Sequence, residues 1–282
     1  MSKIIRDRFA LNSDLRVGSV QRPPFKGVLY RDDGVNEYGR HVFTKVNENI
    51  VTLGGSITAL EKLAGVTAAF KPNSINDIMG INTGHDYHPE ATTVALFGVG
   101  TGGAALDFAN VFDPSVKQNI VADMVPMMVS ENDLTGADAS KYMMKSTITT
   151  SGGTQLKCWY LKEFETTPII RSLWKDAATD EEDGSEITDD ISESESLNDV
   201  EAFVQYKLKI TQYDVRSYFE AMGMLNMARY NSIGLYTGEK ILLPDGTYDY
   251  VNVRLFSVVN INNEPLDQRK EITYYYRVYA MV

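Results

Sequence analysis

The stretch Val200-Glu201-Ala202-Phe203-Val204-Gln205-Tyr206-Lys207-Leu208-Lys209-Ile210 is the most regular part of this 282-residue chain. Its even-numbered positions are all apolar or aromatic, and its odd-numbered positions hold charged and amide side chains together with Phe203. Because successive side chains of a β-strand point to opposite faces, this period of two predicts a half-buried antiparallel strand.

Turn signals separate further strands around it. Pro244-Asp245-Gly246 lies between two β-type runs, where proline presets φ and glycine accepts a positive φ. Asn260–Pro265 separates Val251–Val259 from Ile272–Val282, and Thr92–Phe97 is another apolar strand. The expected fold is therefore mainly β with α (α+β), an antiparallel β-sandwich-like core with one or two helices.

Two segments show the period of a helix. Asn49–Phe70 carries a start signal at Gly54-Gly55-Ser56, and the face expected to be buried holds Leu60, Leu63, Ala64 and Phe70. The second helix is expected to begin at Thr211, with Asp214 as its capping partner, and to end by Gly234. Its apolar stripe consists of Val215, Tyr218, Phe219, Met222 and Leu225.

Most of the net charge is confined to one segment. Asp176–Glu201 holds twelve carboxylates, no lysine, arginine or aromatic residue, and without it 26 acidic residues remain against 27 basic ones. A segment this charged cannot bury enough apolar surface to offset its ordering entropy, so a long acidic loop is expected. It is interpreted either as a spacer or as a partner-binding or charge-repelling element.

The amino-terminal region is basic and has no sustained period. It contains seven basic residues and two acidic ones before residue 32, and Pro23-Pro24 interrupts any helix. We expect residues 1–48 to form an extended arm and residues 49–282 a single β-rich domain. Contact with another protein is the favoured use of the arm, since the acidic balance of the whole chain opposes nucleic acid. Its candidate contact residues are Arg6, Arg8, Phe9, Leu11, Arg16, Phe25 and Tyr30.

The terminal strand adds further candidates. Alternation places Tyr274 and Tyr276 on one face and Tyr275, Arg277 and Tyr279 on the other, so both faces carry aromatic area. Such a strand is either central in a two-layered core or covered by a partner, and aromatic residues with arginine are typical anchors of interfaces.

One motif suggests a different class of function. Gly98, Gly100 and Gly103 have the spacing G-x-G-x-x-G after an apolar strand, and Asp123 follows twenty residues later. This is the arrangement of a dinucleotide site, and a nucleotide-dependent enzyme is the alternative reading. Against it, the expected helix Ala104–Phe112 is short and no further βα repeat follows. A glycine turn that permits close backbone approach is the simpler interpretation.

Other chemistry has little support. His85, Asp86, His88 and Glu90 lie in one proline-bounded turn, which does not resemble a fixed metal site, and neither metal nor cofactor is expected. The single cysteine, Cys158, is expected to be a buried structural thiol. No stretch is apolar enough to cross a bilayer, and no secretion signal is expected at the amino terminus.

The chain resembles virion structural proteins of large tailed bacteriophages. The resemblance is carried by Tyr213–Phe219, Ala228–Asn231, Gly234-Leu235-Tyr236 and the terminal strand Ile272–Tyr279, with Leu96–Gly103 more loosely. It implies a non-enzymatic subunit, made in the host cytoplasm and placed at the neck, tail or capsid surface of the virion, with the head-to-tail neck or connector or the tail favoured over the shell. Its implied partners are copies of itself in a symmetric ring or lattice and other virion proteins, without membrane contact.

Overall fold

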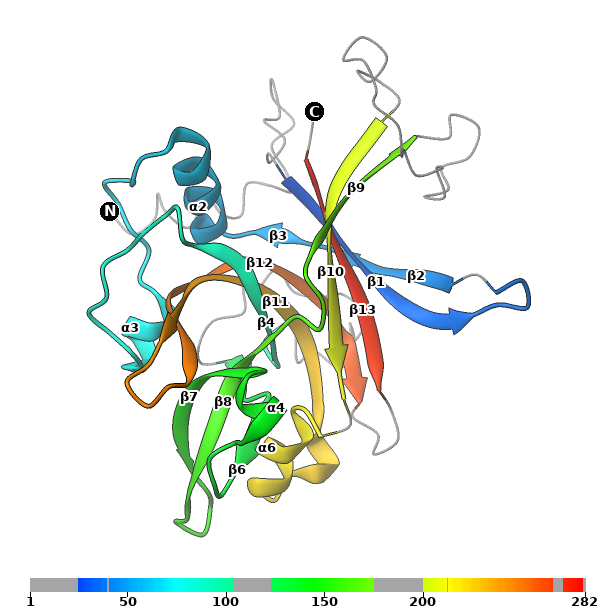
Figure 1. Ribbon diagram of the computed structural model, residues 1–282. Coiled ribbons are helices and arrows are strands. Elements are labelled where there is room, and N and C mark those ends of the chain that lie inside the picture. Colours follow the sequence, from blue (N-terminus) through cyan, green and yellow to red (C-terminus); the bar gives the residue numbers. More distant parts are fainter. Residues whose placement is uncertain are drawn as a thin grey trace, which may run out of the picture.

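Two antiparallel β-sheets form the body of the protein in a computed structural model (Figure 1). The structure describes residues 25–39, 41–103, 123–174, 200–211, 213–265 and 271–280. One sheet has the strand order β2-β1-β13-β10-β9, and the other β3-β12-β11-β4-β8-β6, with β5 beside β4 and β7 beside β8. The expected α+β class with an antiparallel, sandwich-like core is confirmed.

The five-stranded sheet consists of β1 (Phe25–Val35), β2 (His41–Glu48), β9 (Ile169–Trp174), β10 (Val200–Ile210) and β13 (Ile272–Ala280). The larger sheet consists of β3 (Ile50–Val51), β4 (Thr93–Gly100), β5 (Met124–Val125), β6 (Met128–Ser130), β7 (Tyr142–Thr149), β8 (Gln155–Glu163), β11 (Arg229–Leu242) and β12 (Tyr248–Pro265). The helices are α2 (Leu53–Ala64), α3 (Ile75–Met79), α4 (Gly136–Ala139), α6 (Arg216–Ala221) and the 3₁₀ turn η3 (Leu225–Met227).

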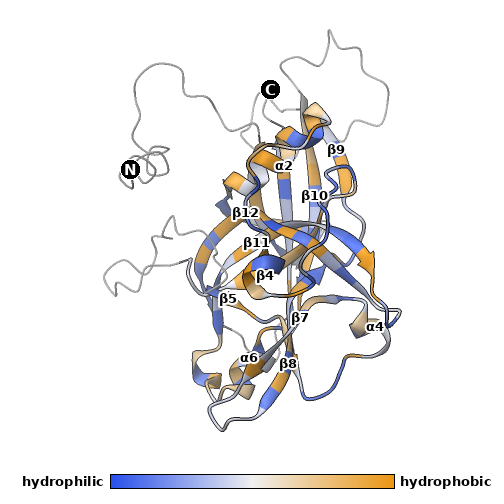
Figure 2. Cartoon of the chain, turned by 90° about the vertical axis from the view of Figure 1, so that its left-hand side faces the viewer, coloured by the Kyte–Doolittle hydropathy of each residue, from blue (hydrophilic) through white to orange (hydrophobic). Residues whose placement is uncertain are grey.

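Strand β10 has the bounds that its period predicted, and it pairs with β13 from Phe203↔Tyr279 to Ile210↔Ile272. Strand β13 is central in its sheet, which explains aromatic residues on both its faces. Tyr274 and Tyr276 point into the sandwich, as the alternation predicted. Hydrophobic and hydrophilic residues follow one another in turn along the strands (Figure 2).

Residues 25–48, which were expected to belong to the arm, are part of this sheet. Strand β1 pairs with β13 from Phe25↔Ala280 to Arg31↔Tyr274, and β2 pairs with β1 on its other side. The alternation of apolar and polar residues could not predict this strand. Val28, Leu29 and Tyr30 are all buried, so both faces of β1 are covered and its sequence does not alternate. Residues 1–24 lie outside the described part of the chain.

The main core lies between the two sheets. Leu208, Tyr276 and Val278 from the smaller sheet pack against the larger one, which contributes Phe97, Val99, Ile233, Leu235 and Val259. Two hydroxyl pairs join the sheets across this core: Tyr230 with Tyr274 at 3.0 Å and Ser257 with Tyr276 at 2.8 Å. Tyrosine can be buried here because each hydroxyl has a partner.

A second cluster covers part of the opposite face of the larger sheet. It includes Leu96, Met143, Leu161, Tyr236 and Val253, together with Ile75 of α3. The larger sheet is thus buried on both faces near its centre, and the outer face of the smaller sheet also buries a few side chains, among them Tyr30, Phe203 and Arg277.

Both predicted helices exist, but each differs from expectation. Helix α2 begins after Thr52, whose hydroxyl oxygen accepts from Gly55 N at 3.0 Å, and ends at Gly65 with φ 65°. Helix α6 has only six residues because Val215 adopts φ 62° and cannot continue a helix back toward Thr211. Asp214 nevertheless accepts the Thr211 N–H at 2.7 Å, as the capping pattern predicted.

The acidic segment connects two paired strands. Residues 175–199 lie outside the described part of the chain, but β9 and β10 pair as far as Val200↔Trp174. The segment therefore leaves and re-enters the sheet at adjacent positions. Among the described helices, none has the length and apolar character required to span a membrane.

Candidate functional site

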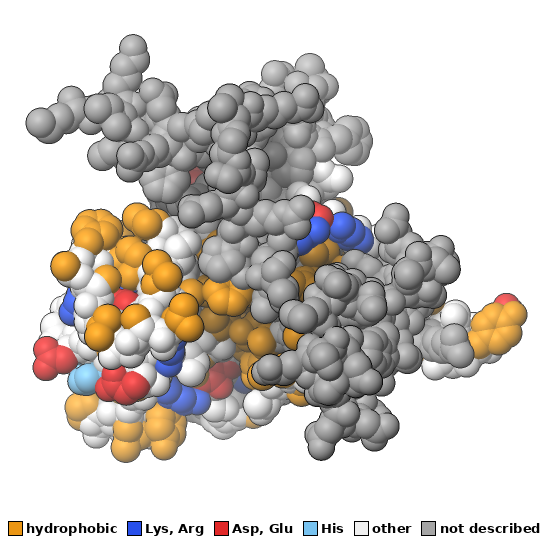
Figure 3. All heavy atoms as spheres, turned by 90° about the horizontal axis from the view of Figure 1, so that it is seen from above, with side chains coloured by type: hydrophobic (Ala, Val, Ile, Leu, Met, Phe, Trp, Pro, Cys, Tyr) orange, Lys and Arg blue, Asp and Glu red, His pale blue; other side chains and the backbone are white. Residues whose placement is uncertain are grey.

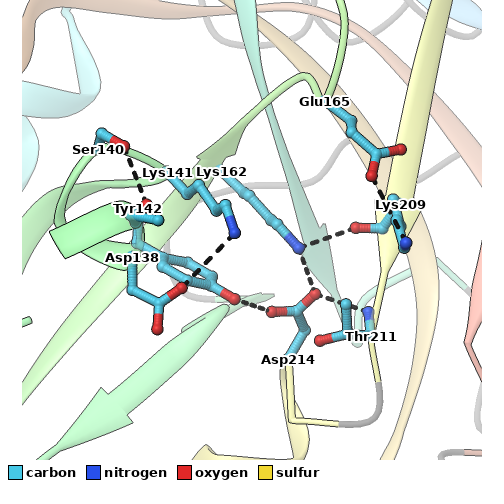
Figure 4. A network of polar contacts seen from close by, with 10 residues as sticks. Asp138, Ser140, Lys141, Tyr142, Lys162, Glu165, Lys209, Thr211 and Asp214 are labelled. Carbon is cyan, nitrogen blue, oxygen red and sulfur yellow. Dashed lines mark hydrogen bonds and ion pairs between the residues drawn. The ribbon is translucent and has the colours of Figure 1, made fainter.

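A buried ion pair joins β8 of the larger sheet to the segment that follows β10 of the smaller sheet (Figure 4). Lys162 of β8 donates from Nζ to Asp214 Oδ2 at 2.6 Å and to the Lys209 carbonyl oxygen at 2.9 Å. The side chains of Lys162 and Asp214 are 9% and 0% exposed. Buried charges of this kind persist only when they are paired and hydrogen-bonded.

Both oxygens of the Asp214 carboxylate are occupied. Oδ1 accepts from the Tyr142 hydroxyl, and Oδ2 accepts from Thr211 N–H as well as from Lys162. The Lys162 ammonium also lies 5.3 Å from the centre of the Tyr142 ring. Burial, and then the Asp214 charge, raise the pKa of Tyr142 well above its ordinary value. With every member engaged, this network stabilises the joint between β8, β10 and α6 and leaves no group directed at a ligand.

A second buried ion pair attaches α2 to the larger sheet. Glu61 of α2 meets Arg254 of β12 at 3.4 Å, and both side chains are at most 3% exposed. The Tyr87 hydroxyl donates to Glu61 Oε2 at 2.5 Å, and the Arg254 guanidinium lies 4.0 Å from the Tyr87 ring centre. Burial, and then the bond to Glu61, raise the pKa of Tyr87 to about 12. The buried face of α2 is thus polar, and it is completed by Gly54, Gly55 and Thr58.

The opposite face of α2 is apolar and exposed, which reverses the sequence prediction. Leu60 and Leu63, expected in the core, are 61% and 85% exposed, and Phe70 beyond the helix is 63% exposed. We call Leu53, Leu60, Leu63, Val66 and Phe70 the α2 apolar surface. Hydrophobic side chains gather over this part of the molecule in the view from above (Figure 3). The physical reason is that Gly55 allows α2 to approach β12 backbone so closely that a Cβ would lie 2.0 Å from the Phe256 oxygen.

Four of the predicted interface residues meet on the outer face of the smaller sheet. The Arg277 guanidinium lies 4.7 Å from the ring centre of Tyr30 and 5.0 Å from that of Phe203. Tyr275 and Tyr279 flank it on β13, and the Tyr279 ring lies 5.0 Å from Phe203. Arg277 is only 7% exposed and donates from Nε to Gln205 at 3.1 Å. Its cation–π and hydrogen-bonding capacity is therefore used within the chain.

Of the remaining predicted contact residues, Phe25 is not on this face. Phe25 packs toward the core, with its ring 6.4 Å from that of Phe256. Arg6, Arg8, Phe9, Leu11 and Arg16 lie outside the described residues.

The glycine motif does not have the geometry of a dinucleotide site. Gly98 and Gly100 lie within β4, which is antiparallel to β11, β5 and β8 instead of opening a βαβ unit. Asp123 precedes β5 and lies against Gly102, where an added Cβ would be 2.4 Å from Oδ2. Close backbone approach explains Gly103 too, since its Cβ would lie 2.1 Å from the Asn231 oxygen. The expected helix Ala104–Phe112 falls outside the described residues.

The other candidates are isolated side chains. His88 pairs with Glu239 at 3.1 Å on the surface, and within the described ranges no group of three or more His, Cys, Asp or Glu side chains is placed to hold a metal ion. Cys158 is completely buried, and burial raises its thiol pKa to about 11. A cleft of about 330 Å³ at one end of the sandwich is lined by Arg31, Val46, Asn47, Ile261, Asn262, Glu264 and Tyr274.

Sequence reasoning missed both buried ion pairs. Lys162 lies in a β-type run and Asp214 at a predicted cap, so each has an ordinary local explanation, and 52 positions separate them. Only the fold brings them together. No family model matches the chain, and neither a curated protein nor a solved structure shows significant similarity to it.

Proposed function

We propose that this protein is a non-enzymatic structural subunit of a tailed-phage virion, in the neck or connector or in the tail, that acts by protein–protein assembly. The resemblance of Tyr213–Tyr236 and the terminal strand to such proteins suggests the class. The observation that carries the proposal is the α2 apolar surface: Leu60, Leu63 and Phe70 are each more than 60% exposed. Exposed apolar side chains that gather on one surface are typical of protein contact sites.

The disposition of charge supports the same function. The buried ion pairs Lys162–Asp214 and Glu61–Arg254 hold structural elements together, and their carboxylates bind protein groups. Exposed apolar side chains alongside buried, internally paired charges are what a building block requires, since its stability and its contacts depend on different residues.

Mass measurement in solution tests this proposal. Sedimentation velocity of the full chain across a wide concentration range is expected to show a discrete oligomer of ring size. A parallel thermal-stability screen with NAD, ATP and related nucleotides is expected to show no saturable stabilisation. A chain that stays monomeric at every concentration, or one stabilised by a nucleotide in a manner that Asp123→Ala abolishes, would overturn the proposal.

A further inference from the structure

Helix α2 turns its polar face toward the protein and its apolar face outward, which is the reverse of an ordinary surface helix. Gly54, Thr58 and Glu61 face the protein, and Leu53, Leu60 and Leu63 project from the opposite side of the helix. The apolar side chains are thus available although the helix is firmly attached. Two features hold it, the Glu61–Arg254 pair and the bond from Thr52 N to the Phe256 oxygen at 3.0 Å.

The α2 apolar surface carries little charge. Between Thr52 and Phe70 the charged residues are Glu61, which is buried, and Lys62, which is exposed. An occupant of this surface therefore gains chiefly from apolar contact and has no need of acidic groups. This favours a segment with several large apolar residues over the acidic segment 176–201.

The first 24 residues contain several large apolar residues, together with five basic and two acidic ones. They include seven large aliphatic or aromatic residues after the initial methionine: Ile4, Ile5, Phe9, Leu11, Leu15, Val17 and Val20. They also join the described structure close to α2, because Phe25 packs on Phe256 and the Phe256 oxygen binds the residue that caps α2. A segment of 24 residues can span about 80 Å when extended, against about 18 Å for a helix of twelve residues.

We propose that residues 1–24 of one copy dock on the α2 apolar surface of a neighbouring copy. This inference rests on the proposed function, because it requires an assembly of copies. Pro23-Pro24 lies directly before β1, and because a proline disfavours helical backbone in the residue before it, extended backbone is favoured at positions 22 and 23. The start of the chain's own α2 is close to Phe25, because both contact Phe256. To dock on its own α2, the segment would have to turn back directly before β1, where extended backbone is favoured. A contact from each copy to the next is head-to-tail, and it closes into a ring when the rotation permits.

Cross-linking between copies gives a direct test. The native cysteine is buried, so Phe9→Cys and Leu63→Cys introduce single reactive thiols on the segment and on the surface. When the two single variants are mixed and oxidised, we expect a disulfide-linked pair that contains one of each. A control pair replaces Leu63→Cys with Leu242→Cys, because Leu242 on β11 is also well exposed, at 62%. The control pair is expected to cross-link far less. A double variant that cross-links only within one chain, while the mixed single variants do not, would overturn the proposal.

Sedimentation separates this inference from the proposed function. Leu63→Glu is expected to weaken self-association about tenfold or more, because it places a charge in an apolar contact, and Leu242→Glu should leave it unchanged. Sodium sulfate should strengthen the wild-type association, whereas docking of the acidic segment would be weakened by salt. If the chain assembles normally and Leu63→Glu has no effect, the α2 proposal alone is wrong. If the wild-type chain does not assemble at all, the proposed function fails as well.

Discussion

Removing the Asp214 carboxylate should destabilise the fold more than any surface change. In Asp214→Ala the Lys162 ammonium keeps only the Lys209 carbonyl as acceptor, and the Tyr142 hydroxyl and the Thr211 N–H lose their partner. Breaking a buried ion pair from one side costs about 3–5 kcal/mol. Because stranded donors add to this penalty, we expect a loss of at least about 3 kcal/mol in the free energy of unfolding.

Urea unfolding followed by circular dichroism measures this loss, and a double-mutant cycle assigns it. Lys162→Met removes the buried positive charge that Asp214 neutralises, so Asp214→Ala should cost several-fold less in that background than in the wild type. Glu165→Gln is the control: its bonds to Lys207 and Lys209 are exposed, and it should cost less than about 1 kcal/mol. Additive effects of the two buried substitutions, or a loss below 1 kcal/mol in Asp214→Ala, would refute the reasoning.

Three further predictions follow from the packing. Replacing Thr179–Ser196 with a short Gly/Ser linker should barely change the unfolding midpoint, because β9 and β10 already pair at Val200↔Trp174; a loss of several kcal/mol would mean that the segment is packed. Gly55→Ala should cost about 1–3 kcal/mol by overpacking against the Phe256 oxygen, although alanine is the better helix former, and unchanged or higher stability in urea would contradict the close approach. Cys158 should resist iodoacetamide at pH 8 in the folded protein, since its thiol pKa is raised to about 11, and should react once the protein is unfolded; rapid native labelling would show an accessible thiol.

The sequence was sufficient wherever one face of a strand is covered and the other is not. Strand β10 is such a strand apart from Phe203, which is buried on the other face, and its alternation predicted its bounds. The turn at Pro244-Asp245-Gly246 likewise lies between β11 and β12 as expected. Strand β1 could not be identified in this way, because burial on both faces removes the period from its sequence.

The orientation of α2 could not be predicted from its apolar stripe. An apolar stripe indicates which side chains favour burial, but it does not indicate whether they are buried by the same chain or by another one. Here Gly54 and Gly55 permit a backbone approach that apolar side chains would prevent, and Glu61 finds Arg254 from a strand 193 positions away. The paired glycines were the local sign of this contact. In the sequence, however, Gly54-Gly55 predicts only the start of a helix, and no local pattern identifies Arg254 as the partner of Glu61.

The adjacent ends of β9 and β10 separate solubility from fold stability. The chain has a net charge of −11 and a pI of about 4.8, and nearly all of this excess lies in one connection that joins neighbouring positions of a hairpin. The remainder of the chain is close to electroneutral, so the mutual repulsion of its copies in solution depends on this one connection. We therefore expect colloidal behaviour and folding to depend on different residues, so that either can be altered by substitution while the other is kept.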